Sequence, residues 1–125
     1  MNSNDTTRPD LQIILDELQK IYDGCKEDNW DGNDAYSINK KTLKCATDLI
    51  SSLPLDVKAP YIIAETNGDV TFEWSIDNKN FISVSVGDDN VVFYNALIKS
   101  ISFNGTLKFT GLWPISVIDI IKSLE

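Results

Sequence analysis

Four carboxylates surround a tryptophan in the segment EDNWDGNDAYS, which spans residues 27–37. Carboxylate oxygens are the ligands that a hard cation such as Ca²⁺ prefers. An EF-hand loop needs acids at alternate positions, but counting from Asp28 puts Trp30 and Gly32 at the third and fifth positions. The frame that begins one residue later lacks the required glycine and glutamate. We therefore expect no metal ligands in this segment.

Two interpretations of the segment remain open. In the first, Trp30 is a hydrophobic plug at the end of a helical hairpin, Asp31 and Gly32 form the turn, and Asp34 lies near the next helix start, where a negative charge is favourable. In the second, Trp30, Asp31 and Asp34 form a docking surface, because tryptophan is favoured at binding hot spots.

Few other residues are candidates for catalysis. Glu65 and Glu73 flank a predicted hairpin, and two carboxylates at the right separation can act as acid and base on a glycosidic bond. An acid that alternates with apolar neighbours is, however, typical of the solvent face of a sheet. Cys25 and Cys45 fall on apolar helix faces, where a thiol is normally inert, and the chain contains no histidine to act as a general base. We expect no catalytic residue, no cofactor and no enzymatic activity.

The composition indicates a small acidic domain. A chain of 125 residues suits one domain, which we expect over residues 10–125 after a frayed tail at residues 1–9. Eleven basic and nineteen acidic residues give a net charge of −8, so nucleic acid is a poor partner. The sequence has no long apolar run and no signal-peptide pattern, which predicts a cytoplasmic protein with reduced cysteines and no membrane contact.

Two helices are predicted to hold the acidic segment between them. Apolar side chains recur at helical spacing over residues 10–25 and about 38–53. Ser37 is a suitable N-cap for the second helix, and Pro54 ends it. The two helices should form an α-hairpin.

From Lys58 the apolar period changes to two, which predicts strands. Asn-Gly pairs at Asn67 and Asn104 indicate hairpin turns. We expect an antiparallel meander of four to six strands and then a helix opened by Pro114. This order predicts an α+β fold with the helices on one face of the sheet. The side chains expected to face the helices are Val70, Phe72, Trp74, Ile76, Ile82, Val84 and Val86.

The other face of the sheet should be polar with a few apolar residues. Alternation places on it Thr71, Glu73, Ser75, Phe81, Ser83, Ser85, Val92 and Tyr94. Scattered apolar side chains are common on ordinary surfaces. Aromatic residues among small hydroxyls can also form a recognition surface for another protein or a second copy.

Short motifs in this chain resemble a group of small bacterial proteins. They are a Trp-Asp-Gly turn, a Leu-Pro and a further proline before the first strand, a Gly-Asp hairpin leading to Glu-Trp, and a Leu-Pro near the end. The likeness spans residues 29–121, but Trp113 lies between the final leucine and proline, which departs from the pattern. The resemblance supports the fold and implies no activity. The residues that it matches to motif positions are Trp30, Asp31, Gly32, Glu73 and Trp74.

Taken together, these features predict an acidic domain that binds another protein, such as an antitoxin- or immunity-type inhibitor covering a basic surface. The residues expected to contact the partner are Trp30, Asp31, Asp34, Glu73, Phe81 and Tyr94. Two alternatives stay open. One is a small-molecule or metal-binding module with its ligand between helices and sheet. The other is an accessory subunit that self-associates, as a homodimer, through an edge strand or the open sheet face.

Overall fold

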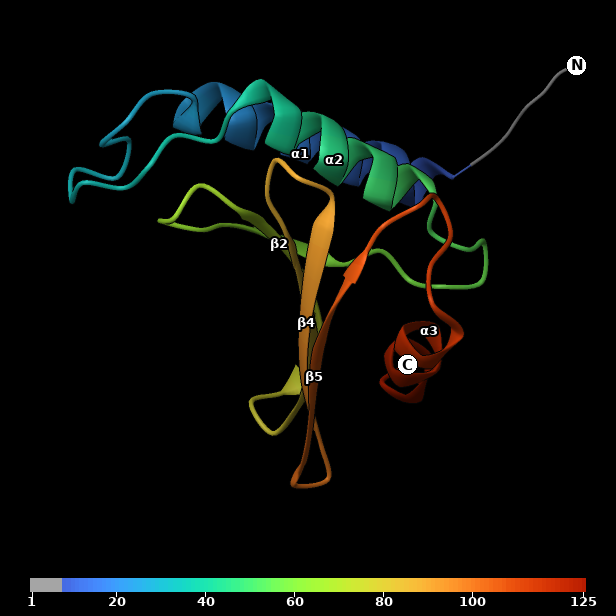
Figure 1. The fold of residues 1–125 in the computed structure, drawn as a ribbon. Coiled ribbons are helices and arrows are strands. Elements are labelled where there is room, and N and C mark those ends of the chain that lie inside the picture. Colours follow the sequence, from blue (N-terminus) through green and yellow to red (C-terminus); the bar gives the residue numbers. More distant parts are fainter. Residues whose placement is uncertain (1–7) are drawn as a thin grey trace, which may run out of the picture.

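The computed structural model describes residues 8–125 of the chain. Two helices are followed by an antiparallel sheet with the strand order β1-β2-β3-β4-β5 and then by a final helix (Figure 1). The predicted α+β class and element order are thus confirmed. The elements are α1 (Pro9–Cys25), α2 (Lys40–Ser51), β1 (Tyr61–Ala64), β2 (Val70–Asp77), β3 (Asn80–Val86), β4 (Val91–Ile98), β5 (Ile101–Lys108) and α3 (Ile115–Ser123).

The first helix of the hairpin ends at Cys25 as expected, but it begins one residue earlier than expected, and the second helix is shorter than expected at both ends. Most of the predicted tail, residues 1–7, lies outside the described residues, but Arg8 and Pro9 belong to the folded domain. The Arg8 guanidinium donates to the carbonyl oxygens of Pro54 and Val57 at 2.9 and 2.8 Å. The cap of α2 is Asn39 rather than Ser37: its side-chain oxygen accepts from the Thr42 amide at 2.8 Å.

The three helices cover one face of the sheet. Figure 1 shows α1 and α2 lying across the first strands and α3 beside the middle of the sheet. Apolar side chains spaced at three and four residues on each helix meet the alternating apolar side chains of the strands. The largest fully buried members of this core are Leu18, Ile38, Leu49, Ile50, Phe72, Ile82 and Ile121.

The predicted alternation is confirmed for β3 and for most of β2, but it is wrong for Ile76. The register shifts between Ser75 and Asp77, and the Ile76 side chain is 63 % exposed. A bulge of this kind adds an unpaired residue and redirects the side chains that follow it.

The predicted open-face position of Val92 and Tyr94 is also wrong. Register pairs Val92 with Val86 and Tyr94 with Val84, so both lie on the helix-covered face. The odd-numbered and the even-numbered residues of β4 both include apolar side chains, so alternation alone does not show which set faces the helices. The pairing register with β3 decides this. The residues of β4 on the open face are Phe93, Asn95 and Leu97.

The second Asn-Gly pair does not form a turn. Asn104 and Gly105 lie inside β5, and the turn is Lys99-Ser100, with positive φ values of 49° and 70°. A Cβ at Gly105 would lie 2.8 Å from the Tyr94 hydroxyl oxygen. The glycine is therefore explained by the Tyr94 ring across the ladder, since glycine in a strand often marks such a close approach.

Candidate functional site

The acidic segment between α1 and α2 is shaped by its own carboxylates. Asp31 accepts hydrogen bonds from the amides of Asn33 and Ala35 at 2.8 and 3.0 Å. Asp28 accepts from the Ser37 amide at 3.0 Å. Side-chain acceptors of this kind stabilise turns by replacing backbone partners. Asp31 thus stabilises the conformation of the loop, and its carboxylate adds negative charge to this part of the surface.

Trp30 anchors this loop. Its indole N–H donates to the Tyr36 carbonyl at 2.8 Å, and its half-buried ring packs against the core. This arrangement is the plug of the first interpretation. The aromatic side chain that the loop presents to solvent is Tyr36, which is 66 % exposed. Sequence reasoning did not identify Tyr36, because the residue types of a loop do not indicate which aromatic side chain is buried and which is exposed.

The loop docks on the turn between β1 and β2. The Tyr36 amide donates to the Thr66 carbonyl at 2.8 Å. Gly68 has a φ of +93°, and a Cβ on it would lie 2.8 Å from the Ser37 carbonyl oxygen. The backbones of two segments that are distant in sequence are therefore in direct contact.

A third loop, between β3 and β4, joins the same end of the molecule. The Asn39 side-chain amide donates to Asp88 at 3.2 Å. A Cβ on Gly87 would lie 2.8 Å from an Asp69 carboxylate oxygen, so these two turns also touch. We name the acids of the three loops the acidic end: Glu27, Asp28, Asp31, Asp34, Glu65, Asp69, Asp88 and Asp89.

The acidic end contains one basic residue, and Lys40 and Lys41 follow its first loop at the start of α2. Lys26 is the single basic residue in the three loops, residues 26–37, 65–69 and 87–90. Burial raises the pKa of the Asp69 carboxyl, and the charges of Asp89, Glu65 and Asp88 raise it further, against a lowering hydrogen bond from Asn67. Burial is the largest cause of the raised pKa, and the neighbouring carboxylates add a smaller repulsive contribution.

The raised pKa of Asp69 predicts that Asp69→Asn changes the free energy of unfolding in a pH-dependent way. Because its pKa is raised, Asp69 keeps its proton to a higher pH in the folded protein than in the unfolded chain. Folding stability therefore falls as the pH rises from the ordinary value of 3.8 through the raised folded value. Asp69→Asn should increase the free energy of unfolding at pH 7, and the gain should shrink below about pH 4.

Urea denaturation at pH 7 and below about pH 4 measures this gain in the free energy of unfolding. Asp119→Asn is the control, since Asp119 is an exposed carboxylate outside the acidic end. It should give no gain at pH 7, because the Asp119 charge attracts Lys122. A variant Asp69→Asn that is less stable than the wild type at pH 7 would contradict the prediction.

The structure divides the predicted partner-binding residues among three places. Trp30, Asp31 and Asp34 belong to the acidic end. Glu73 and Phe81 lie on the open face, where register pairs Glu73 with Tyr61 and Ser83. Tyr94, as corrected above, lies on the covered face. The six residues do not form one continuous surface.

Glu65 and Glu73 do not form a catalytic pair. Glu65 lies at one end of the β1–β2 ladder and accepts from the Thr71 hydroxyl at 2.6 Å. Glu73 pairs with Tyr61 at the other end of the ladder. The four-residue strand β1 therefore separates the two carboxylates.

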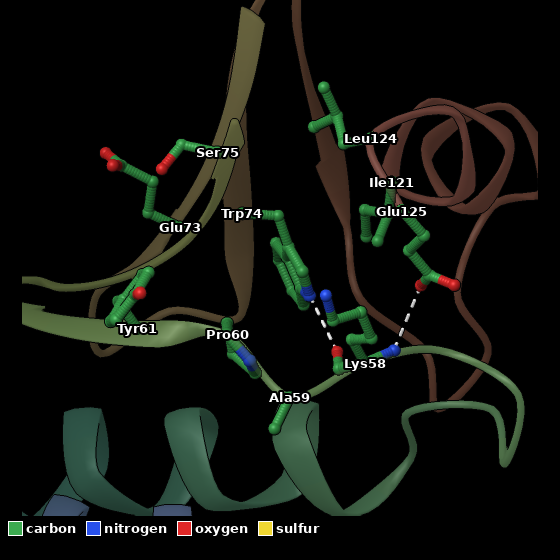
Figure 2. A pocket seen from close by; sticks show the side chains of 10 residues that line it. All are labelled: Lys58, Ala59, Pro60, Tyr61, Glu73, Trp74, Ser75, Ile121, Leu124 and Glu125. Atoms are coloured by element: carbon green, nitrogen blue, oxygen red, sulfur yellow. Dashed lines mark hydrogen bonds between the residues drawn. The ribbon is translucent and has the colours of Figure 1, made fainter. Parts of the chain in front are cut away.

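One hollow lies between the start of β1, strand β2 and the end of α3 (Figure 2). Its volume is about 270 Å³, and other hollows in the described residues have volumes of about 310–380 Å³, at the low end of the roughly 300–1,000 Å³ that is usual for ligand sites. The Trp74 indole N–H, which borders it, already donates to the Lys58 carbonyl at 2.7 Å, and the Lys58 amide donates to Glu125 at 3.1 Å. Within residues 8–125, no group of three or more Cys, Asp or Glu side chains is placed to hold a metal ion.

The chain was compared with protein-family models, curated proteins and solved structures, and none of the three comparisons found a match. In the part of the chain that the structure describes, every helix is too short or too polar to cross a membrane.

Proposed function

We propose that this protein binds a basic protein partner through the acidic end, as an antitoxin- or immunity-type inhibitor does. The observation that carries the proposal is the convergence of eight carboxylates on three connected loops that contain a single lysine. Concentrated charge of one sign attracts an oppositely charged surface over a distance of about 10 Å or less and speeds association.

The loops of the acidic end are held by hydrogen bonds before any partner binds. The bonds from Trp30 to Tyr36 and from Tyr36 to Thr66 are both 2.8 Å. A preformed surface loses less conformational entropy on association than a flexible one. The exposed Tyr36 ring supplies an apolar contact of the kind that is enriched at binding hot spots.

The test is capture of partners from a lysate of the source cells by the immobilised protein at low and at high salt. The variant Glu27→Gln/Asp34→Asn removes two exposed charges from the acidic end. The matched control Glu17→Gln/Asp119→Asn removes two exposed charges from α1 and α3. We expect the wild type and the control to capture the same basic protein at low salt.

The acidic-end variant should bind the captured protein about threefold to thirtyfold more weakly, because each of the two exposed charge pairs contributes up to about 1 kcal/mol. High salt should reduce the difference by screening. The proposal fails if no protein is captured at low salt, if salt has no effect, or if the control loses as much binding as the acidic-end variant.

A further inference from the structure

Strand β5 is an open edge of the sheet. It is paired with β4 on one side only, and it runs for eight residues. Figure 1 shows the β4–β5 hairpin extending away from α1 and α2. The opposite edge strand, β1, has four residues, follows Pro60 and contacts α1. A short strand after a proline is a protected edge, whereas β5 has no proline or bulge to prevent pairing.

The unpaired amides of β5 belong to its even-numbered residues. At one end of the ladder, the Phe109 amide donates to the Asn90 carbonyl at 2.8 Å. At the other end, Ile98 and Ile101 flank the two turn residues. In a β-turn of this kind the carbonyl of the first of the four residues, Ile98, accepts from the amide of the fourth, Ile101. Odd-numbered residues of β5 therefore bond to β4. The alternation of antiparallel pairing turns the N–H and C=O groups of Ser102, Asn104 and Thr106 outward.

The hairpin lies in the longest stretch of the chain without acids. No Asp or Glu occurs from Val91 to Ile118, although the whole chain carries nineteen acidic residues and a net charge of −8. Two copies of such an acidic protein repel each other over most of their surfaces. The β5 edge is a stretch at which they can approach without placing carboxylates opposite each other.

Apolar side chains accompany this edge. Ile101 and Phe103 are 58 % and 40 % exposed, and they lie with Leu107 on the face that continues the core. Ser102, Asn104 and Thr106, on the other face, are small and uncharged. Neighbouring strands that pair here would gain both main-chain hydrogen bonds and apolar contact.

We propose that a second copy of this chain pairs with β5, antiparallel and about a two-fold axis perpendicular to the sheet, and joins the two five-stranded sheets into one. Such an axis keeps each face continuous and pairs even-numbered residues with even-numbered ones, whose N–H and C=O groups already point outward. With Gly105 on the axis, Phe103 of one copy faces Leu107 of the other. The interface uses no residue of the acidic end.

Sedimentation velocity over a wide range of protein concentration, up to millimolar, tests the pairing. We expect the wild type to approach twice the chain mass of 14.0 kDa. Asn104→Lys places two like charges opposite or diagonal to each other across the axis, and it should weaken the dimer about tenfold or more. Asn104→Pro removes an outward amide but no bond to β4, and it should also give monomers.

The matched control is Asn95→Lys. Asn95 pairs directly with Asn104 and lies on the same face, one strand in from the edge. This variant should remain dimeric, as should the acidic-end variant Glu27→Gln/Asp34→Asn, so failure of the dimer and failure of partner capture are distinguishable. A wild type that stays at 14.0 kDa overturns the proposal. A dimer that survives both Asn104 variants, or that Asn95→Lys disrupts as strongly, also overturns it.

Discussion

Replacing Trp74 with alanine is expected to lower the free energy of unfolding by about 3–5 kcal/mol, the usual loss for a buried tryptophan. The Trp74 side chain is 5 % exposed and meets the Trp113 ring edge to face, with ring centroids 6.0 Å apart. The substitution removes that contact and leaves a cavity between the sheet and α3. It also leaves the Lys58 carbonyl without its indole donor, which adds to the cost.

Two further variants separate the contributions to this loss. Trp74→Phe keeps an aromatic ring and removes the indole N–H, so it should cost about 1–3 kcal/mol. Ile76→Ala, two residues along the same strand, should change stability by about 0.5 kcal/mol or less, because that side chain lies mainly in solvent. Urea denaturation followed by circular dichroism measures all three. A similar loss for Ile76→Ala and Trp74→Ala would mean that the strand does not bulge after Ser75.

Replacing Gly68 with alanine is expected to cost about 2 kcal/mol or more. Its φ of +93° is unfavourable for any residue with a Cβ, and the added carbon would lie 2.8 Å from the Ser37 carbonyl oxygen. Because that oxygen belongs to the backbone, a side-chain rotation cannot relieve the clash. The acidic segment must then move away from the β1–β2 turn.

Gly32→Ala is the matched control. Gly32 has a φ of +76°, but no atom lies within 4 Å of a Cβ placed there. In this variant only the backbone conformation is strained. The difference between the two variants in the free energy of unfolding therefore measures the cost of the clash with Ser37. Gly68→Ala should also speed hydrogen exchange of the Tyr36 amide, which bonds to Thr66. Equal destabilisation by the two variants, with Tyr36 exchange unchanged, would show that the contact contributes nothing.

Local patterns in the sequence were sufficient to predict the helices and most of the strands. The apolar spacing of α1 and α2 marks the sides that they bury, and Asn67-Gly68 marks the first hairpin, where Gly68 does adopt a positive φ. These signals work because helix periodicity and turn conformation depend on residues that are close in sequence. The group of carboxylates in residues 27–37 is also visible in the sequence, because its members are close together in the chain.

Pairing between distant segments decided the rest. Either the odd-numbered or the even-numbered residues of β4 could have faced the core. The register with β3 placed Val92 and Tyr94 under the helices. Gly105 resembles a turn residue until the Tyr94 ring is seen across the ladder. The acidic end gathers loops through hydrogen bonds that no short motif encodes, between Tyr36 and Thr66, 30 positions apart, and between Asn39 and Asp88, 49 positions apart. Side-chain alternation is local, whereas register, edges and loop contacts depend on how the whole chain packs.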